Sequence, residues 1–187
     1  MVKKAAAVFI SGKGSNLKAL LLNSKTYSFP IEIKLVVSSN KNAKGLAYAK
    51  KWSVPYVIFN NNNILNEIKL LNELKKRKIK VLCLAGYMKI LSKNFIKIFN
   101  NDIINIHPSL LPKFKGIKTF ERILKSKEKK TGCSVHYVNE KLDSGKIILK
   151  KSFFIKNSDN IYSLKKKTQF LEYRAFSQAI IKLYSQN

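Results

Sequence analysis

The feature that most constrains the fold of this 187-residue chain is the alternation of strand-like and helix-like segments along its whole length. Short apolar runs such as Val81 to Ala85 alternate with segments such as Ile64 to Arg77, whose apolar residues recur at helical spacing. The expected strands are Ala5 to Ile10, Glu32 to Ser39, Pro55 to Phe59, Val81 to Ala85, Asp102 to His107, Cys133 to Val138 and Lys146 to Phe154. The expected helices are Leu17 to Asn23, Gly45 to Trp52, Ile64 to Arg77, Ser92 to Phe99, Thr119 to Lys125 and Tyr162 to Tyr184.

This order of elements predicts the α/β class, with a mainly parallel sheet and crossover helices. We expect a Rossmann-like three-layer sandwich whose central sheet has about seven strands. The last two strands flank a turn at Asp143, so we expect an antiparallel pair there, followed by a long C-terminal helix. Because no linker or repeat divides the sequence, we expect a single domain over residues 1–187.

The composition excludes several classes of protein. Hydrophobic residues make up 45% of the chain, and no run approaches the roughly 20 apolar residues of a membrane span. The basic and then apolar start leads directly into a glycine-rich turn, which indicates a first strand rather than a signal peptide. Cys83 and Cys133 lie far apart inside apolar runs, so neither a disulfide framework nor a metal site is indicated. We expect a soluble protein of a reducing cytoplasm, without a membrane partner.

The formal charge of +27 raises the question of a nucleic-acid partner, because basic proteins are attracted to phosphate backbones. Only three of the 37 basic residues are arginine, whereas readers of phosphates and bases favour the arginine fork. The lysines are spread along the chain and accompany 18 asparagines, as in the product of an AT-rich coding sequence. We interpret the charge as compositional drift and expect no specific nucleic-acid partner. A charge selected for anionic ligands stays as the alternative.

Two motifs supply the side chains of an acyl-transfer site. Asn105 and His107 lie at the carboxyl end of a predicted strand, before the turn from Pro108 to Pro112, and Asp143 lies in a glycine-bearing turn. An amide can stabilise an oxyanion, an imidazole can move a proton near neutral pH, and a carboxylate can orient that imidazole. Each residue also has a structural interpretation, since a histidine before proline and an aspartate in a turn are commonly structural. We expect the second histidine, His136, in the core or beside the site.

The first turn, Ser11-Gly12-Lys13-Gly14-Ser15-Asn16-Leu17, predicts an anion site. Its glycines let main-chain N–H groups approach a phosphate, and the following helix turns its positive end toward that phosphate. The turn lacks the third glycine of a dinucleotide fingerprint and the Gly-Lys-Ser/Thr of a P-loop. Ser15 and Asn16 favour a monophosphate over a merely tight turn.

Together with Leu84-Ala85-Gly86-Tyr87-Met88-Lys89-Ile90-Leu91 and Gly132-Cys133-Ser134-Val135-His136, these motifs resemble the folate-dependent phosphoribosylglycinamide formyltransferase family over nearly the whole chain. The resemblance implies transfer of a formyl group from 10-formyltetrahydrofolate to the amine of phosphoribosylglycinamide in purine biosynthesis. It requires no metal, and we expect a monomer or weak homodimer.

The resemblance also assigns roles to residues. The implied catalytic residues are Asn105, His107 and Asp143. The residues implied in ribonucleotide binding are Gly14, Ser15, Asn16, Gln169, Phe170, Leu171 and Glu172. The residues implied in folate binding are Met88, Lys89, Ile90, Leu91, Asn105, Asn139, Glu140, Lys141, Leu142 and Asp143.

Three positions depart from the family pattern. Asn63 stands where an arginine is often found near the folate tail, and Lys118 and Phe120 replace common histidines. Since the catalytic residues are intact, we expect these departures to weaken folate binding rather than abolish the reaction.

Three alternatives remain. Methionyl-tRNA formyltransferase shares the donor and the catalytic residues, but resembles this fold with an added C-terminal barrel, whereas this sequence stops at Asn187. A folate deformylase normally carries an additional N-terminal domain. A non-catalytic RNA-binding relative would be expected to have lost the catalytic residues, which are present.

Overall fold

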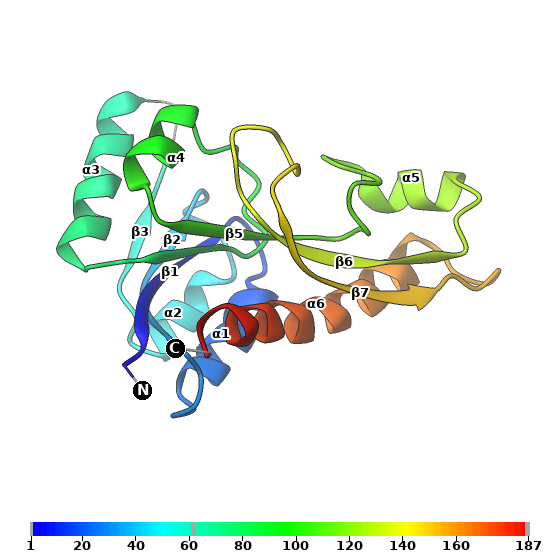
Figure 1. The fold of residues 1–187 in the computed structure, drawn as a ribbon, viewed down its shortest axis with the longest axis horizontal. Coiled ribbons are helices and arrows are strands. Elements are labelled where there is room, and N and C mark those ends of the chain that lie inside the picture. Colours follow the sequence, from blue (N-terminus) through cyan, green and yellow to red (C-terminus); the bar gives the residue numbers. More distant parts are fainter. Residues whose placement is uncertain (1, 61–62, 186–187) are drawn as a thin grey trace.

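The computed structural model describes residues 2–60 and 63–185, which form a seven-stranded sheet between layers of helices (Figure 1). The strands are β1 (Lys4–Ile10), β2 (Ile31–Ser38), β3 (Tyr56–Ile58), β4 (Val81–Leu84), β5 (Asp102–His107), β6 (Lys130–Tyr137) and β7 (Ile147–Phe154). The helices are α1 (Ser15–Ser24), α2 (Leu46–Lys51), α3 (Ile64–Lys76), α4 (Lys93–Phe99), α5 (Thr119–Lys125) and α6 (Ile161–Tyr184). The predicted α/β sandwich and its long C-terminal helix are confirmed.

The strand order β3-β2-β1-β4-β5-β6-β7 decides where a ligand can bind. The first five strands are parallel, and β6 is antiparallel to both β5 and β7, which confirms the predicted C-terminal pair. The chain moves outward from β1 to β3 and then returns to β4 on the other side of β1. Such a reversal opens a crevice at the carboxyl ends of the two neighbouring strands. The loops after β1 and β4 are therefore the first places to look for a site.

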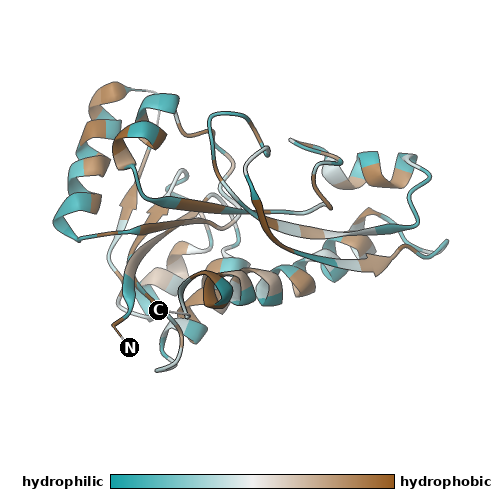
Figure 2. Ribbon diagram, viewed as in Figure 1, coloured by the Kyte–Doolittle hydropathy of each residue, from teal (hydrophilic) through white to brown (hydrophobic). Residues whose placement is uncertain are grey.

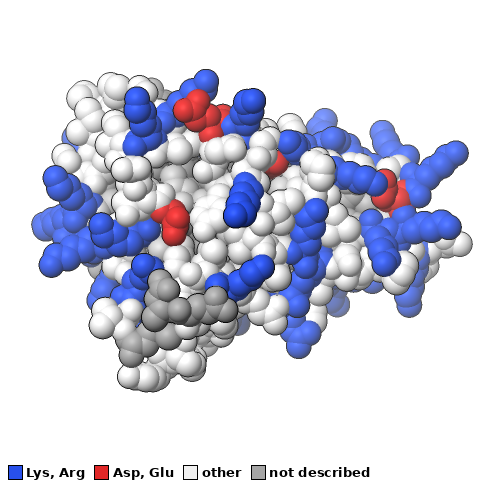
Figure 3. Space-filling model, in the orientation of Figure 1, with Lys and Arg blue, Asp and Glu red and all other residues white. Residues whose placement is uncertain are grey.

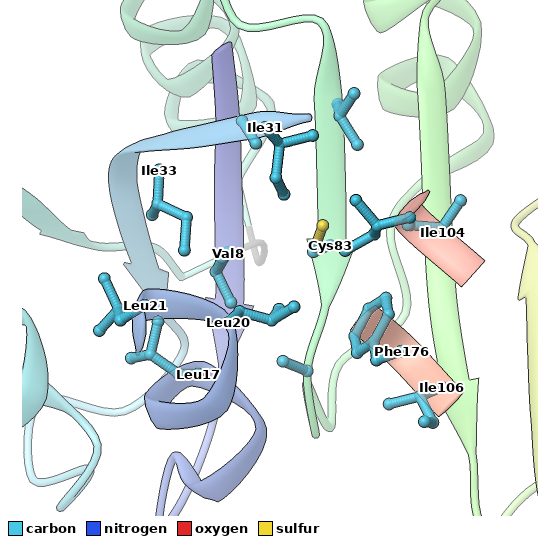
Figure 4. Close-up of a cluster of buried hydrophobic side chains, with 14 of the residues drawn as sticks. Val8, Leu17, Leu20, Leu21, Ile31, Ile33, Cys83, Ile104, Ile106 and Phe176 are labelled. Carbon is cyan, nitrogen blue, oxygen red and sulfur yellow. The ribbon is translucent and has the colours of Figure 1, made fainter. Parts of the chain in front are cut away.

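Two apolar clusters hold the layers together. One lies between the sheet and helices α1, α2 and α6, and includes Leu17 and Phe176 (Figure 4). The other lies on the opposite face, where Leu74 and Phe95 of α3 and α4 pack on the sheet. In Figure 2 the central strands are accordingly coloured as hydrophobic along much of their length. Burial of this apolar surface is the main force that fixes the sheet in place.

Helix boundaries follow local capping. The Ser92 side chain accepts a hydrogen bond from the Phe95 main-chain N–H and caps α4. Asn160 caps α6 through a reciprocal pair of bonds with Ser163. Among the described residues, no helix is long and apolar enough to cross a membrane. The starts of α4 and α6 are thus set by side chains that satisfy unpaired main-chain N–H groups.

The charge distribution is diffuse on the face shown in Figure 3. Lysine and arginine side chains are spread across that face from end to end, with a few acidic side chains among them. Positive charge is not gathered into one patch on this face. On this face the basic side chains are therefore as widely spread as the lysines are along the sequence.

Candidate active site

Asn105 and His107 lie at the carboxyl end of β5 and share one face of the sheet. Successive side chains of a strand point to opposite faces, and the intervening Ile104 and Ile106 belong to the apolar cluster beside α6. Asn105 and His107 therefore point to the opposite face, where loops rather than a helix lie over this end of the strand (Figure 1). The His107 side chain is 7% exposed. The strand thus presents a partly buried amide and a buried imidazole on the same face.

Asp143 reaches His107 from the loop between β6 and β7. The distance between Asp143 Oδ2 and His107 Nδ1 is 3.3 Å, and the Gly116 main-chain N–H donates to the same oxygen at 2.8 Å. Asp143 has a φ of 47°, in the left-handed region that aspartate tolerates better than most residues. A Cβ at Gly145 would collide with the Tyr137 carbonyl oxygen, so only glycine allows the loop to close this tightly. We call Asn105, His107 and Asp143 the Asn-His-Asp cluster.

Both ring nitrogens of His107 face hydrogen-bond acceptors. Nδ1 faces the Asp143 carboxylate, and Nε2 lies 2.9 Å from the Phe114 carbonyl oxygen. A carbonyl oxygen can only accept, and an ionised carboxylate can only accept. The imidazole ring of His107 therefore lies between two oxygen atoms, one on each side.

The second histidine, His136 on β6, lies beside the Asn105 amide. Burial lowers the pKa of its imidazole, although the Tyr137 carbonyl and the charge of Asp143 partly oppose that effect. Its Nδ1 lies 2.9 Å from the Tyr137 carbonyl oxygen, so a neutral ring carries its proton there. Nε2 is then an acceptor for the Asn105 amide nitrogen, at 3.2 Å. His136 thus orients the Asn105 amide, with one N–H of that amide left for another acceptor.

In the first turn, residues 11–17, Gly14 packs directly against Gly45. Gly14 has a φ of 71°, and a Cβ on it would lie 2.5 Å from the Gly45 Cα. Helix α1 starts immediately after Gly14, which provides no side-chain cap for the helix. Unpaired N–H groups at a helix start favour an anion there. The start of α1, next to the close contact of the two glycines, therefore offers main-chain N–H groups to a small anionic group.

Helix α6 supplies two side chains to the first turn. Gln169 Nε2 donates to Ser15 Oγ at 2.8 Å, and Asn16 Nδ2 donates to Glu172 Oε2 at 2.9 Å. Burial raises the pKa of the Glu172 carboxyl to about 7, and the hydrogen bond from Asn16 opposes that rise. The buried Asn16 Oδ1 has no hydrogen-bond partner within residues 2–60 and 63–185. These groups form a polar site with an acceptor still available for a donor on a ligand.

Phe170 and Leu171, predicted in the same set, line a pocket that Gln169 lines as well. Phe170 is exposed and, with Phe153 and Phe154, lines a surface pocket of about 620 Å³ between α6 and the end of β7. Leu171 lines the same pocket and packs against the apolar core. Successive residues of a helix point about 100° apart, so Gln169 and Glu172, three residues apart, share a face of α6 and both hydrogen-bond to the first turn.

The two segments predicted to bind folate flank the Asn-His-Asp cluster. Met88 to Leu91 follows β4, with Met88 81% and Ile90 70% exposed and Leu91 buried in the core. Asn139 to Asp143 is the loop after β6, in which Asn139 accepts a hydrogen bond from the Lys141 main chain and Leu142 is exposed. Lys93, at the start of α4, forms an ion pair of 3.6 Å with Glu140. Exposed apolar side chains on both segments suit a flat, partly apolar ligand. Lys89 is also exposed.

Asn63 has a local structural role. Its side chain accepts a hydrogen bond from the Leu65 main-chain N–H at 2.8 Å and caps α3. The residue expected in place of a folate-tail arginine is therefore engaged in starting a helix.

Sequence reasoning missed the main-chain groups of the site. The Phe114 carbonyl and the Gly116 N–H contact His107 and Asp143, yet neither depends on a recognisable side chain. The sequence signal for this turn is the glycine after Lys113-Phe114-Lys115, since glycine favours positive φ. In the structure, residues 114 and 116 both have positive φ. Within the described ranges, no group of three or more His, Cys, Asp or Glu residues could hold a metal ion.

Comparison with known proteins points to one family. Residues 4–180 match the formyl transferase family. The phosphoribosylglycinamide formyltransferase of Haemophilus influenzae is 35% identical over 181 residues, which cover 95% of this chain and 85% of that protein. The crystal structure of phosphoribosylglycinamide formyltransferase from Brucella melitensis has a TM-score of 0.91 at 34% identity, and the match covers 99% of this chain and 97% of that chain.

A longer protein matches over a small part of its length. The trifunctional purine biosynthetic protein adenosine-3 of Drosophila pseudoobscura pseudoobscura is 36% identical over 189 residues. The match covers 98% of this chain and 14% of that protein. This chain therefore corresponds to a small portion of that relative.

Proposed function

Because this chain belongs to the formyl transferase family, we propose that it transfers the formyl group of 10-formyltetrahydrofolate to the amine of phosphoribosylglycinamide. The products would be formylglycinamide ribonucleotide and tetrahydrofolate, in de novo purine biosynthesis. The observation that carries the proposal is the position of two sites at one edge of the sheet. The first turn follows β1 and the Asn-His-Asp cluster ends β5, and these strands are parallel members of the same sheet.

The first turn is the proposed site of the ribonucleotide phosphate. The start of α1 offers main-chain N–H groups, and Ser15 Oγ keeps its own hydrogen because it accepts from Gln169. Asn16 of α1 and Glu172 of α6 are hydrogen-bonded to each other beside Ser15. Their side-chain oxygens can accept hydrogen bonds from the hydroxyls or the amine of the acceptor. A phosphate held here would place the rest of the acceptor along the sheet edge, toward β5.

The Asn-His-Asp cluster is the proposed site of chemistry. The neutral amine of the acceptor attacks the formyl carbon, and the resulting tetrahedral species carries a negative oxygen and a positive nitrogen. Asn105 has a free amide N–H to donate to that oxygen, and His107 has a second donor at Nε2. We expect the formyl oxygen to take the place of the Phe114 carbonyl on Nε2. Two such donors stabilise the charge that develops in the transition state.

Asp143 keeps His107 charged and in position while the intermediate breaks down. The bond between the formyl carbon and the folate nitrogen breaks, and a proton passes from the attacking amine to that folate nitrogen. His107 can carry this proton by giving the proton on Nε2 to the folate nitrogen and then taking one from the amine, or a water molecule held beside it can pass the proton while His107 stays charged. The carboxylate of Asp143 favours the charged ring before and after the transfer, from a position fixed by the Gly116 N–H.

The proposal is tested by mixing purified protein with 10-formyltetrahydrofolate and phosphoribosylglycinamide. We expect the absorbance change that accompanies release of tetrahydrofolate, dependent on both substrates. Normal folate binding without turnover would refute the reaction. The same assay with methionyl-tRNA as the acceptor tests the main alternative, for which we expect no formylation.

A further inference from the structure

Ser11 links the loops that follow the two strands at the reversal of strand order. It is the first residue after β1, and its Oγ accepts a hydrogen bond from the Met88 main-chain N–H at 2.8 Å. Met88 belongs to the loop after β4, the neighbour of β1 in the sheet. Thus one hydroxyl joins the start of the first turn to the start of the segment Met88 to Leu91.

A second serine orients that hydroxyl. Ser39, directly after β2, has its Oγ 2.6 Å from Ser11 Oγ, and its main-chain N–H donates to the Ile10 carbonyl. Because Ser11 Oγ accepts from Met88, its own hydrogen is free to point toward Ser39 Oγ. The loops after three adjacent strands are thus joined through two hydroxyl groups.

The loop after β4 has few other anchors on the β1 side. The Ala85 N–H continues the strand ladder to the Phe9 carbonyl at 2.8 Å. The Tyr87 ring lies edge-on against the Phe9 ring, with 5.3 Å between the centroids. The Met88 side chain is exposed, so it does not fix the main chain by burial. The bond to Ser11 is thus a polar contact that fixes the main chain where Met88 to Leu91 begins.

We propose that Ser11 is a positioning residue that aligns the folate-binding segment with the phosphate-binding turn. This inference rests on the proposed function, which places folate against Met88 to Leu91 and the phosphate at residues 14–16. Ser11 touches neither substrate in this arrangement. It acts through the Met88 main chain, by holding the donor's binding segment at a fixed distance from the acceptor's.

The test is the steady-state kinetics of Ser11→Ala. The variant loses the neutral hydrogen bond from the Met88 N–H, which holds the folate-binding segment in place. Loss of one such bond predicts an increase of about fivefold in KM for 10-formyltetrahydrofolate. We expect kcat and KM for phosphoribosylglycinamide to stay within about twofold of wild type, because the Asn-His-Asp cluster and the start of α1 are unchanged. Ser11→Thr, which keeps the hydroxyl, should restore most of the folate affinity. A purely structural role would lower stability without this selective change in KM.

Two further variants sharpen the test. Ser126→Ala is the matched control, because Ser126 Oγ also accepts a main-chain N–H, that of Glu128, but lies at the end of α5. It should leave both KM values unchanged. Ser39→Ala should raise the folate KM less than Ser11→Ala, and should add nothing when Ser11 is already alanine. An unchanged folate KM in Ser11→Ala, or an equal change in Ser126→Ala, would overturn the proposal.

Direct binding separates failure of this inference from failure of the proposed function. Titration calorimetry with tetrahydrofolate should show weaker binding to Ser11→Ala than to wild type by about fivefold. If wild type binds tetrahydrofolate and the variant binds it equally, the role of Ser11 is wrong and the proposed function stands. If wild type binds no tetrahydrofolate, the proposed function is wrong, and the inference fails with it.

Discussion

The first turn and the Asn-His-Asp cluster are built on different principles, although both end parallel strands of one sheet. The first turn is shaped by main-chain packing, with Gly14 against Gly45, and its polar atoms include an unpaired acceptor, Asn16 Oδ1. In the cluster, His107 and Asp143 are already paired with each other and with main-chain groups. The shape of the first turn thus depends on the small volume of two glycines, whereas the geometry of the cluster depends on charged and hydrogen-bonded side chains. Substitutions that change volume should therefore damage the first turn, and those that change charge should damage the cluster.

The largest expected effect is removal of charge from the cluster. His107→Ala or Asp143→Ala should lower kcat by about a hundredfold to a thousandfold, because a donor to the oxyanion or the charge that supports it is lost. Steady-state kinetics measure the effect, and circular dichroism should show a folded protein for each variant. Asp143→Asn is the matched variant that keeps the shape of the side chain and removes its charge. Full rates in His107→Ala and Asp143→Ala would contradict the assigned chemistry.

The next effect concerns space in the first turn. Gly14→Ala places a Cβ against the Gly45 main chain at a φ of 71°, so we expect unfolding to become easier by about 2 to 4 kcal/mol. We also expect a higher KM for phosphoribosylglycinamide. Gly12→Ala is the control, since a Cβ there meets nothing within 4 Å and its φ is not positive. Urea unfolding of both variants measures the difference. Equal stability losses in the two would show that the close contact of Gly14 with Gly45 is not what shapes the turn.

The sequence predicted some helix and strand bounds better than others. The bounds of β5 agree with the prediction because an apolar run ends at His107, just before proline. Strand β6, by contrast, begins at Lys130 rather than Cys133, because pairing with β7 extends the strand through residues without an apolar signal. Helix α3 was predicted from its periodicity, yet Ile64 and Leu65 are exposed. Periodicity finds a helix, whereas the sheet decides which residues it buries.

The predictability of the site follows the same division. His107 and Asp143 could be predicted because side chains of suitable chemistry stand in motifs, and the structure brings them together. The Phe114 carbonyl could not, because every residue has a carbonyl group and only the path of the loop selects this one. Phe170 was predicted in the same run as Gln169 and Glu172, and its exposed side chain lines a pocket that Gln169 also lines, so its role stays a prediction. The catalytic and binding roles of these residues stay predictions until the variants are assayed.

The pH dependence of stability should have opposite signs in the two regions. The raised pKa of Glu172 means that the folded state holds a proton which the unfolded state releases above its ordinary value of 4.5. Stability from this group is therefore lost as pH rises toward about 7, by roughly 3 kcal/mol. The lowered pKa of His136 means that the unfolded state takes up a proton first, so stability from that group is lost as pH falls below 6.5.

Urea unfolding from pH 4 to pH 8 separates the two contributions. Glu172→Gln should remove the loss of stability at rising pH and leave the loss at low pH. His136→Gln should do the reverse. If Glu172→Gln left the pH profile of the wild type unchanged, desolvation of Glu172 would not be the source of the slope, and the first turn would carry no titrating group.

The smallest expected effect tests whether side chains of α6 contribute to the first turn beyond its main-chain shape. Gln169→Ala removes the donor to Ser15 Oγ and leaves the close contact of the two glycines in place. Loss of one neutral hydrogen bond predicts a rise of about fivefold in KM for phosphoribosylglycinamide, with kcat unchanged. Gln178→Ala is the control, because Gln178 is an exposed residue of the same helix. A rise in KM confined to Gln169→Ala would mean that α6 holds the Ser15 hydroxyl in position, so that the first turn depends on a side-chain contact as well as on space. Equal kinetics in the two variants would mean that the main chain alone shapes the phosphate site, without a contribution from the Gln169 side chain.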